Sequence, residues 1–249
     1  MSSPEPIPAA TLVLFRERGD GPPELLMVER AKAMAFAGGA MVFPGGRIDP
    51  GDRLLAELYP DLPDAAARIA AIRETVEEAG VAVGITPLPS PEQLAELRVK
   101  LHAGEPLGRV LEAAELGLDL AALTPFARWL PAHAHARIFD TLFFLARAPE
   151  GVDASVDRTE NVRLVWTTAR GMLADVDVGR AAAIFPTRRN LERLALFASF
   201  DDAVADARAH PIRAVTPWIE ERDGAEHLCI PDDLGYPITS EPLTEAVRG

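Results

Sequence analysis

The feature that most constrains this chain is a short acidic run at residues 73–81, which reads RETVEEAGV. If the run is helical, Glu74, Glu77 and Glu78 stand at i, i+3 and i+4, so their carboxylates project from one helix face. Like charges this close raise one another's pKa unless a cation lies among them. The alternative is a solvated acidic helix end, which is what acidic pairs on helices usually are.

The residues before the acidic run predict an amphipathic helix. Ile69, Ile72 and Val76 fall on one helix face, which can hold the helix on a sheet. Gly80 follows at the position where a helix C-terminus favours glycine. We therefore expect a helix that Asp64 caps at its start and Gly80 ends.

The same run predicts a particular kind of cation. Carboxylate oxygens in this number suit a hard ion, Mg²⁺ or Mn²⁺. The upstream Phe-Pro-Gly-Gly turn contains Gly45 and Gly46, which would let backbone carbonyls approach the same ion. Arg73 lies one turn before Glu77 and can orient a carboxylate. Because the turn and the run occur together, a metal site is favoured over a solvated helix end. The expected ligands are Glu74, Glu77, Glu78 and Gly45.

The rest of the chain alternates short apolar runs with helical patterns. Residues 11–15 and 25–28 flank a turn rich in Gly and Pro, which indicates a β-hairpin. Strands are also expected at residues 126–130, 139–146 and 162–167, and helices at 91–101, at 105–116, from Pro186 and from a cap at Asp201. The tail from Arg213 has little periodicity. Strands on both sides of a helix in the sequence indicate an α/β sandwich with a mixed sheet.

The amino-acid composition limits the classes of partner that the chain can bind. The 249 residues include 25 basic and 38 acidic side chains, a net charge of −13. So acidic a chain should be repelled by nucleic acid and by anionic membranes, and a phosphorylated substrate would need a bound cation. No segment has the apolar length of a membrane span or the pattern of a signal peptide. Cys229 is the single cysteine, which favours a reducing cytoplasm. Only two of the basic residues are lysines, a bias typical of GC-rich bacterial genes.

Residues 46–81 resemble the signature of the Nudix hydrolase family. That signature is a glycine, five residues, a glutamate, seven residues and then R-E-U-x-E-E-x-G-U, where U is a bulky apolar residue. Its positions are matched by Gly46, Arg73, Glu74, Glu77, Glu78, Gly80 and Val81. The resemblance implies an α/β/α sandwich with a mixed sheet and a metal-dependent hydrolase of nucleoside-linked diphosphates.

The chain departs from the signature at three points. Asp52 stands where the first glutamate is expected, and Thr75 stands where an apolar residue is expected. Twenty residues rather than seven separate Asp52 from Arg73. The signature loop therefore carries a 13-residue insertion, which we expect at about residues 53–64.

The insertion makes the chain similar to one branch of the family, the peroxisomal acyl-CoA diphosphatases and their bacterial relatives. The segments MVFPGG ahead of the insertion and RIFDTLFF behind it support this resemblance. A sister group has a coenzyme A motif with an arginine where this chain has Ala35, and Arg30 is the nearest substitute. The substrate-binding residues that the resemblance implies are Arg30 and Arg137.

The resemblance also implies a general base, because a carboxylate must take the proton of the attacking water. Our candidate is Glu160, with Glu74 as its rival, and Arg73 completes the expected catalytic set. We expect a Nudix domain over residues 8–175 and a C-terminal helical extension with an irregular tail, packed on that core, over 176–249.

Three functions remain open from the sequence. The first is a diphosphatase of coenzyme A or acyl-CoA. The second is a pyrophosphatase of ADP-ribose or NADH, and the third is a Nudix-fold nucleotide-binding module without catalysis. The family resemblance makes a homodimer plausible in each case.

Overall fold

A mixed β-sheet forms the centre of the protein, in a computed structural model that describes residues 5–19, 21–34, 37–131, 138–151, 153–156 and 160–246. β1 (Ile7–Arg16) runs parallel to β8 (Phe139–Arg147) and antiparallel to β2 (Glu24–Arg30). The strand order is β10-β7-β8-β1-β2-β3, with β4 paired to β1 and β9 paired to β2. The other strands are β3 (Met41–Val42), β4 (Gly45–Arg47), β7 (Thr124–Trp129), β9 (Asn161–Thr168) and β10 (Ala214–Val215).

Both faces of this sheet are buried. Along β1, Leu12 and Leu14 face one hydrophobic core and Val13 and Phe15 face the other. A strand with apolar residues on both faces needs a layer of helices on each side. The β1–β2 pairing places Phe15 opposite Leu25, which confirms the predicted hairpin.

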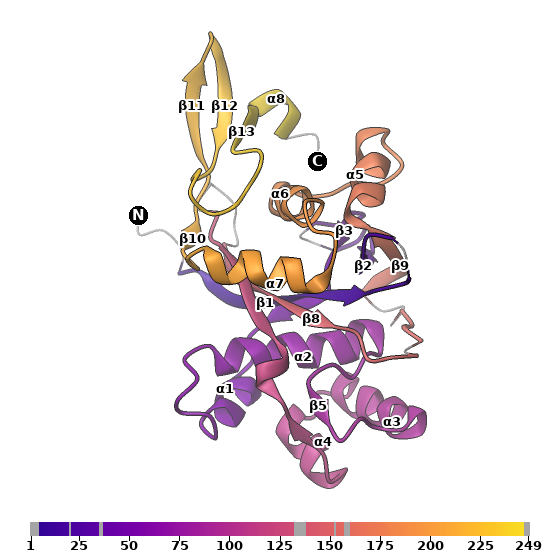
Figure 1. Cartoon of the computed structure of the whole chain (residues 1–249). Helices are drawn as coiled ribbons and strands as arrows, with labels where there is room; N and C mark the ends of the chain where they lie inside the picture. The colour runs from indigo at the N-terminus through magenta and orange to yellow at the C-terminus, as the bar shows by residue number, and fades with distance from the viewer. Residues whose placement is uncertain are drawn as a thin grey trace.

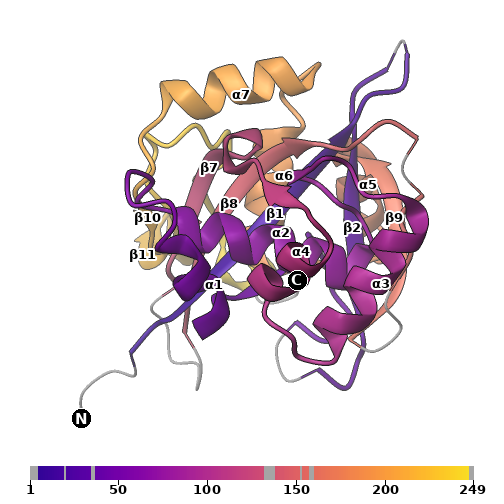
Figure 2. The ribbon, with the colours of Figure 1, turned by 90° about the horizontal axis from the view of Figure 1, so that it is seen from below.

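Helices cover the two faces separately, which gives the predicted α/β/α sandwich (Figure 1). One face carries α1 (Pro50–Ala56), α2 (Ala65–Ala79), α3 (Pro91–His102) and α4 (Leu107–Ala113), seen in front of the sheet in Figure 2. The other face carries α5 (Ala169–Asp177), α6 (Phe185–Leu194) and α7 (Phe200–Ala209). Short strands β5 (Ile85–Thr86) and β6 (Gly117–Leu118) and the 3-10 helix η1 (Leu120–Ala122) connect α2, α3, α4 and β7.

Helix α2 has the bounds that its sequence predicts. Ile69, Ile72 and Val76 are buried on the sheet, and Gly80 ends the helix with a left-handed backbone at φ 63°. Asp64 occupies the N-cap position, but its carboxylate accepts from Arg68 at 2.8 Å and does not cap the backbone. The ion pair with Arg68 therefore replaces the expected cap.

The insertion is partly helical. The predicted loop at 53–64 begins within α1, which extends to Ala56, and only the remainder is irregular. Leu55, Tyr59 and Leu62 pack against the core. The insertion is thus anchored on the sandwich by apolar side chains of its own.

The C-terminal tail corrects the prediction of an irregular segment. It forms a second sheet of β11 (Trp218–Arg222), β12 (Ala225–Cys229) and β13 (Ser240–Pro242), followed by α8 (Leu243–Ala246). Asp223 and Gly224 both have positive φ, as a tight hairpin turn requires. Figure 1 shows this hairpin projecting from the sandwich. Residues in β11 are exposed on both faces, so no apolar alternation marks the strand.

Two smaller boundaries also differ from the prediction. Ser199, rather than Asp201, caps α7, since its hydroxyl accepts from the Asp202 N–H at 3.1 Å. The expected domain boundary at residue 175 falls inside α5, and β10 from the tail joins the central sheet beside β7.

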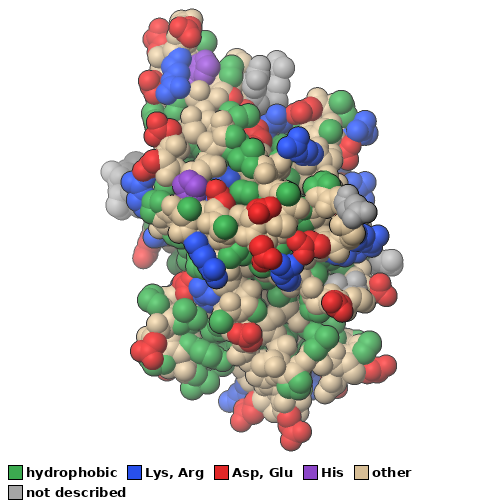
Figure 3. Space-filling view, viewed as in Figure 1, with side chains coloured by type: hydrophobic (Ala, Val, Ile, Leu, Met, Phe, Trp, Pro, Cys, Tyr) green, Lys and Arg blue, Asp and Glu red, His purple; other side chains and the backbone are tan. Residues whose placement is uncertain are grey.

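The surface carries charges of both signs. On the face in Figure 3, acidic and basic side chains are interspersed. Within the described ranges, no helix combines the length and the apolar character needed to cross a membrane.

Candidate active site

The acidic end of α2 opens into a cleft of about 790 Å³. Glu74, Glu77 and Glu78 line it together with Gly45 and Gly46 of β4. The helix spacing brings the three carboxylates to one side, and the pairing of β4 with β1 brings the glycines beside them. The cleft therefore joins the two halves of the sequence signature.

Only glycine fits at the two β4 positions. A Cβ on Gly45 would lie 2.4 Å from the Ala10 carbonyl oxygen, and one on Gly46 would lie 2.2 Å from Oε1 of Glu74. Gly45 also donates its N–H to Oε2 of Glu78 at 3.1 Å. The contact that the structure shows for Gly45 is thus this hydrogen bond, which orients Glu78.

Arg73 is anchored by Asp52 beneath the carboxylates. Asp52 is 2% exposed and Arg73 6% exposed. Nε and Nη2 of Arg73 donate to the Asp52 carboxylate at 3.0 and 2.9 Å. Asp52 also accepts from the Asp49 N–H at 2.9 Å. Asp52 therefore supplies a buried partner for Arg73 across the insertion, from the position where the family signature has a glutamate.

Arg73 extends from this anchor to the acidic cluster. Its Nη1 donates to Glu74 at 2.9 Å and to Glu77 at 3.4 Å. Its Nη2 donates to the backbone carbonyl of Arg47 at 2.9 Å. One guanidinium thus fixes two carboxylates of α2 relative to β4.

Burial shifts the titration of the cluster. Burial raises the pKa of Glu74 to about 7 against the opposing charge of Arg73, and the nearby Glu77 raises it further. Burial also raises the pKa of Glu78 to about 8, with the Glu74 charge acting in the same direction. A hydrogen bond from Asn161 opposes the shift at Glu78. The pKa of Glu77 is raised for the same first reason, burial. The raised pKa values mean that the protein alone does not fully offset the cost of keeping these carboxylates negatively charged.

The donor set suits a hard divalent cation. Among the described residues, no three acidic, His or Cys side chains converge closely enough to hold a metal ion as they stand. Arg73 contacts two of the carboxylates, so an ion would take part of its place. The chemistry of the site nevertheless fits, because three oxygen-donor side chains with undercompensated charge line one cleft.

Arg30 and Glu160 lie on the wall of the same cleft. Nη2 of Arg30 is 3.6 Å from Oε2 of Glu160, and the Glu160 side chain is largely exposed. The backbone holds the two together, since the Ala31 N–H donates to the Glu160 carbonyl at 2.8 Å. The other predicted substrate-binding residue, Arg137, lies outside the described residues.

The cleft also contains residues that the sequence did not indicate. His102 at the end of α3 lines it, and its charge lowers the pKa of Glu77 against the larger effect of burial. Thr187, in the first turn of α6, lines it as well. Asn161 is fully buried at the start of β9 and lowers the pKa of Glu78 against the larger effect of burial. No local pattern marks these residues, because tertiary packing alone brings them to the site.

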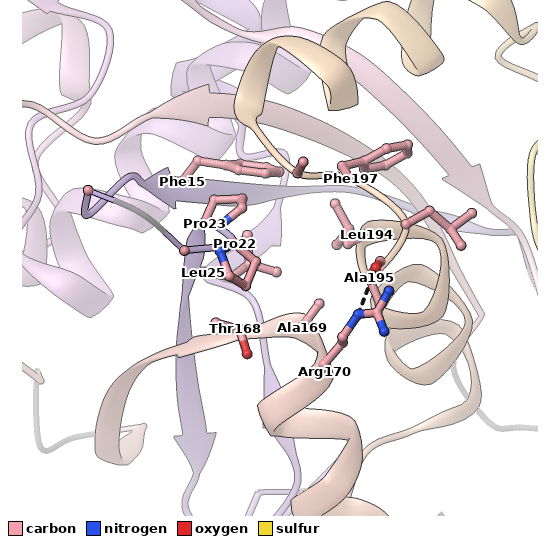
Figure 4. Close-up of a pocket in the computed structure, with 14 residues that line it drawn as sticks. Phe15, Pro22, Pro23, Leu25, Thr168, Ala169, Arg170, Leu194, Ala195 and Phe197 are labelled. Atoms are coloured by element: carbon pink, nitrogen blue, oxygen red, sulfur yellow. Dashed lines mark hydrogen bonds between the residues drawn. The ribbon is translucent and has the colours of Figure 1, made fainter.

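A second cavity, of about 460 Å³, lies between the β1–β2 turn and the end of α6. Figure 4 shows a mainly apolar wall that includes Phe15, Pro22 and Phe197. Its one charged side chain among the lining residues, Arg170, donates to the Ala195 carbonyl at 3.2 Å. The described residues that line this cavity include no acidic side chain.

Comparison with known proteins agrees with this geometry. No family model matches the chain. Human acyl-coenzyme A diphosphatase NUDT19 is 26% identical over a region covering 84% of this chain and 72% of the human protein. The crystal structure of a NUDIX hydrolase from Alicyclobacillus acidocaldarius matches with a TM-score of 0.72 and 29% identity, covering 82% of this chain and 97% of that one.

The sandwich, the acidic helix end and these similarities define a hydrolase of nucleoside diphosphate derivatives. The chain has the fold of Nudix hydrolases and is similar to them over most of its length.

Proposed function

We propose that this protein is a Mg²⁺- or Mn²⁺-dependent diphosphatase that cleaves coenzyme A or its acyl esters. The observation that carries the proposal is the single cleft that joins the acidic end of α2, the cationic Arg30 and an apolar wall. In the reaction, water adds to one phosphorus of the diphosphate and the bridging P–O bond breaks. The relative NUDT19, named an acyl-coenzyme A diphosphatase, supports this substrate class.

Glu74, Glu77 and Glu78 would hold the cation. A bound divalent ion neutralises phosphate oxygens and lowers the pKa of a coordinated water. Gly45 orients Glu78 through its N–H, and Arg73 orients Glu74 and Glu77 through Nη1. These contacts hold the carboxylates in place in the protein alone, and Arg73 would yield part of its place to the ion.

Glu160 is the proposed general base. Its largely exposed carboxylate lies on the cleft wall, where it would accept a proton from a water beside a bound diphosphate. Arg30, 3.6 Å away, would contact a phosphate oxygen and steer the substrate toward that carboxylate. Glu74 is the rival base, but its carboxylate is hydrogen-bonded to Arg73, whereas the Glu160 side chain is largely exposed.

The apolar wall would accept the part of the substrate that carries no phosphate. It is formed by Phe139 and Phe143 of β8, Trp129 of β7, and Phe43 between β3 and β4. Aromatic surface of this kind binds a nucleobase or an aliphatic arm. The cleft thus provides separate surfaces for the two chemically different parts of a coenzyme A molecule.

A substrate panel tests the proposal. Coenzyme A, acyl-CoA, NADH and ADP-ribose are incubated with Mg²⁺ or Mn²⁺, and the products are identified by mass. We expect coenzyme A to yield phosphopantetheine and adenosine 3′,5′-diphosphate. Cleavage of ADP-ribose or NADH alone would assign the second function. Nucleotide binding without any product would assign the non-catalytic module.

Site variants separate the roles. Glu77→Gln should remove metal-dependent turnover and weaken Mg²⁺ binding in calorimetry. Glu160→Gln should lower turnover while Mg²⁺ binding is retained. Glu112→Gln, an exposed acidic residue on α4, is the matched control and should change neither. Full turnover in Glu77→Gln would reject the metal assignment, and an unchanged rate in Glu160→Gln would reject the base.

A further inference from the structure

The first turn of α6 opens onto the same cleft as the acidic end of α2. Ile184, Pro186 and Thr187 all line the cleft. Ile184 at the N-cap has no side-chain acceptor for the helix, and Pro186 has no N–H to satisfy. The N–H groups of Phe185 and Thr187 have no acceptor in the described part of the chain. A helix start of this kind concentrates partial positive charge where an anion can reach it.

Thr187 provides an independent observation. It is 3% exposed and stands on the cleft wall. Within the described residues, no group hydrogen-bonds its hydroxyl. The hydroxyl oxygen is not enclosed but accessible from the cleft, so a ligand in the cleft can pair with it. The hydroxyl and the free N–H groups are therefore donors that face a common space.

The first turn of α6 carries basic and no acidic side chains, although Arg188 and Arg189 are not among the residues that line the cleft. Helix starts usually carry acidic residues, but this one carries none and has Arg188 and Arg189 instead. Arg189 is 1% exposed, and its Nη2 donates to Glu192 and Glu241 at 2.7 and 3.0 Å. Its Nε and Nη1 have no partner among the described groups. No carboxylate of the first turn competes with an incoming anion.

We propose that the first turn of α6 binds a phosphomonoester of the substrate that is separate from the diphosphate being cleaved. This inference rests on the proposed function, because it places the diphosphate at the acidic end of α2 with its cation. The α6 turn offers hydrogen-bond donors and no carboxylates, so it takes a phosphate directly. Since both lie in one cleft of about 790 Å³, one ligand can occupy both. The preferred substrates are thus diphosphates that also carry a phosphomonoester, as coenzyme A does.

Calorimetry on the full chain without added metal tests this site. The probes are adenosine 3′-monophosphate and adenosine, which differ by one phosphomonoester. We expect the first to bind about tenfold more tightly, as a charged hydrogen-bonded group contributes. Thr187→Val should abolish most of that preference, and Thr187→Ser, which keeps the hydroxyl, should retain it. Thr141→Val, on the same cleft wall, is the matched control and should also retain it.

The outcomes distinguish this inference from the proposed function. Equal affinity of the wild-type protein for the two probes would overturn the site, whatever the variants do. A folded Thr187→Val protein that keeps the preference would also overturn it. If coenzyme A is not cleaved but the preference exists and depends on Thr187, the proposed function fails and the anion site stands. In the active enzyme, Thr187→Val should raise KM for coenzyme A about tenfold and leave KM for dephospho-coenzyme A unchanged.

Discussion

The substitution Asp52→Asn tests whether the buried Asp52–Arg73 ion pair holds Arg73 in place across the insertion. The substitution removes the negative charge of a pair in which both partners are nearly inaccessible, Asp52 at 2% and Arg73 at 6%. Burial alone would lower the pKa of Arg73, but its hydrogen bond to Asp52 and the charges of Glu74, Asp52 and Glu77 raise it overall. Arg73 therefore stays charged in the variant and loses its closest buried counter-charge.

The magnitude follows from what Arg73 retains. Removing one partner of a buried ion pair costs about 3–5 kcal/mol. Arg73 keeps hydrogen bonds to Glu74 and to the Arg47 carbonyl, both at 2.9 Å. We therefore expect the lower end of that range, about 3 kcal/mol. In a protein of this size, that loss lowers Tm by roughly 6–12 °C.

Urea unfolding followed by circular dichroism, together with calorimetric Tm, measures the effect. Asp49→Asn is the matched control. The Asp49 carboxylate lies 3.8 Å from Nη2 of Arg73 with its side chain 53% exposed, so its loss should cost less than about 1 kcal/mol. An equally small loss for Asp52→Asn would refute the argument that Asp52 anchors Arg73 across the insertion.

Four further predictions concern the helix end, the glycines and the buried tyrosine. Glu77→Gln should reduce metal-dependent kcat at least about 100-fold with little change in Tm, as measured by initial rates and melting. Gly46→Ala places a methyl group 2.2 Å from Glu74, so displacement of that carboxylate should lower kcat by about 10- to 100-fold. Gly80→Ala forces a left-handed backbone on a side chain and should cost about 1–2 kcal/mol in urea unfolding. Burial raises the pKa of Tyr236 to about 12 from an ordinary value of 10.0. The stability this contributes is complete below the ordinary pKa and is lost as pH rises toward the folded one, which tyrosinate absorbance and alkaline unfolding would follow.

The Gly46 and Tyr236 predictions each have a control within the chain. Gly21→Ala has open space around its new methyl group and should keep full kcat. If Gly46→Ala is equally active, the tight contact with Glu74 does not constrain the site. Tyr59→Phe should leave the late alkaline transition in place, whereas Tyr236→Phe should remove it. Titration of Tyr236 near its ordinary pKa in the folded protein would contradict its burial.

The parts of the fold that were predictable are those with local signals. The apolar spacing of Ile69, Ile72 and Val76 gave the length and buried face of α2, and Gly80 gave its end, because a helix cannot continue cheaply through a left-handed residue. The hairpin of β1 and β2 was predictable for the same reason, since two apolar runs flank a turn of Gly and Pro. The spacing of the acidic run also placed three carboxylates on one helix face.

The C-terminal hairpin has a turn signal in its sequence, but the polar strands beside it do not show the apolar alternation typical of strands. Asp223-Gly224 is a strong tight-turn dipeptide, but the strands around it are exposed on both faces. Without apolar alternation, the polar residues read as an irregular tail. A tight-turn dipeptide can therefore indicate a hairpin even where the flanking strands lack apolar alternation.

Other features depend on contacts between distant residues and had no local signal. Asp52 and Arg73 meet across 21 positions only because the insertion packs on the core and returns the chain to α2. Thr187 and His102 reach the cleft from opposite helical layers. Their roles follow from tertiary packing, which a motif of fixed length does not encode.

The charge distribution of the cleft joins these observations. An acidic chain with a net charge of −13 gains nothing in stability from buried carboxylates whose pKa values rise to about 7 and about 8. Groups kept in so unfavourable a setting are typical of functional sites, where a ligand supplies the missing compensation. At the α2 end that ligand is a cation, since the excess charge is negative. At the α6 end the unpaired groups are donors, so the complementary ligand is an anion. A metal-bound diphosphate with a further phosphomonoester, the substrate proposed above, would satisfy both ends, and its binding would let a strongly acidic protein select a strongly anionic substrate.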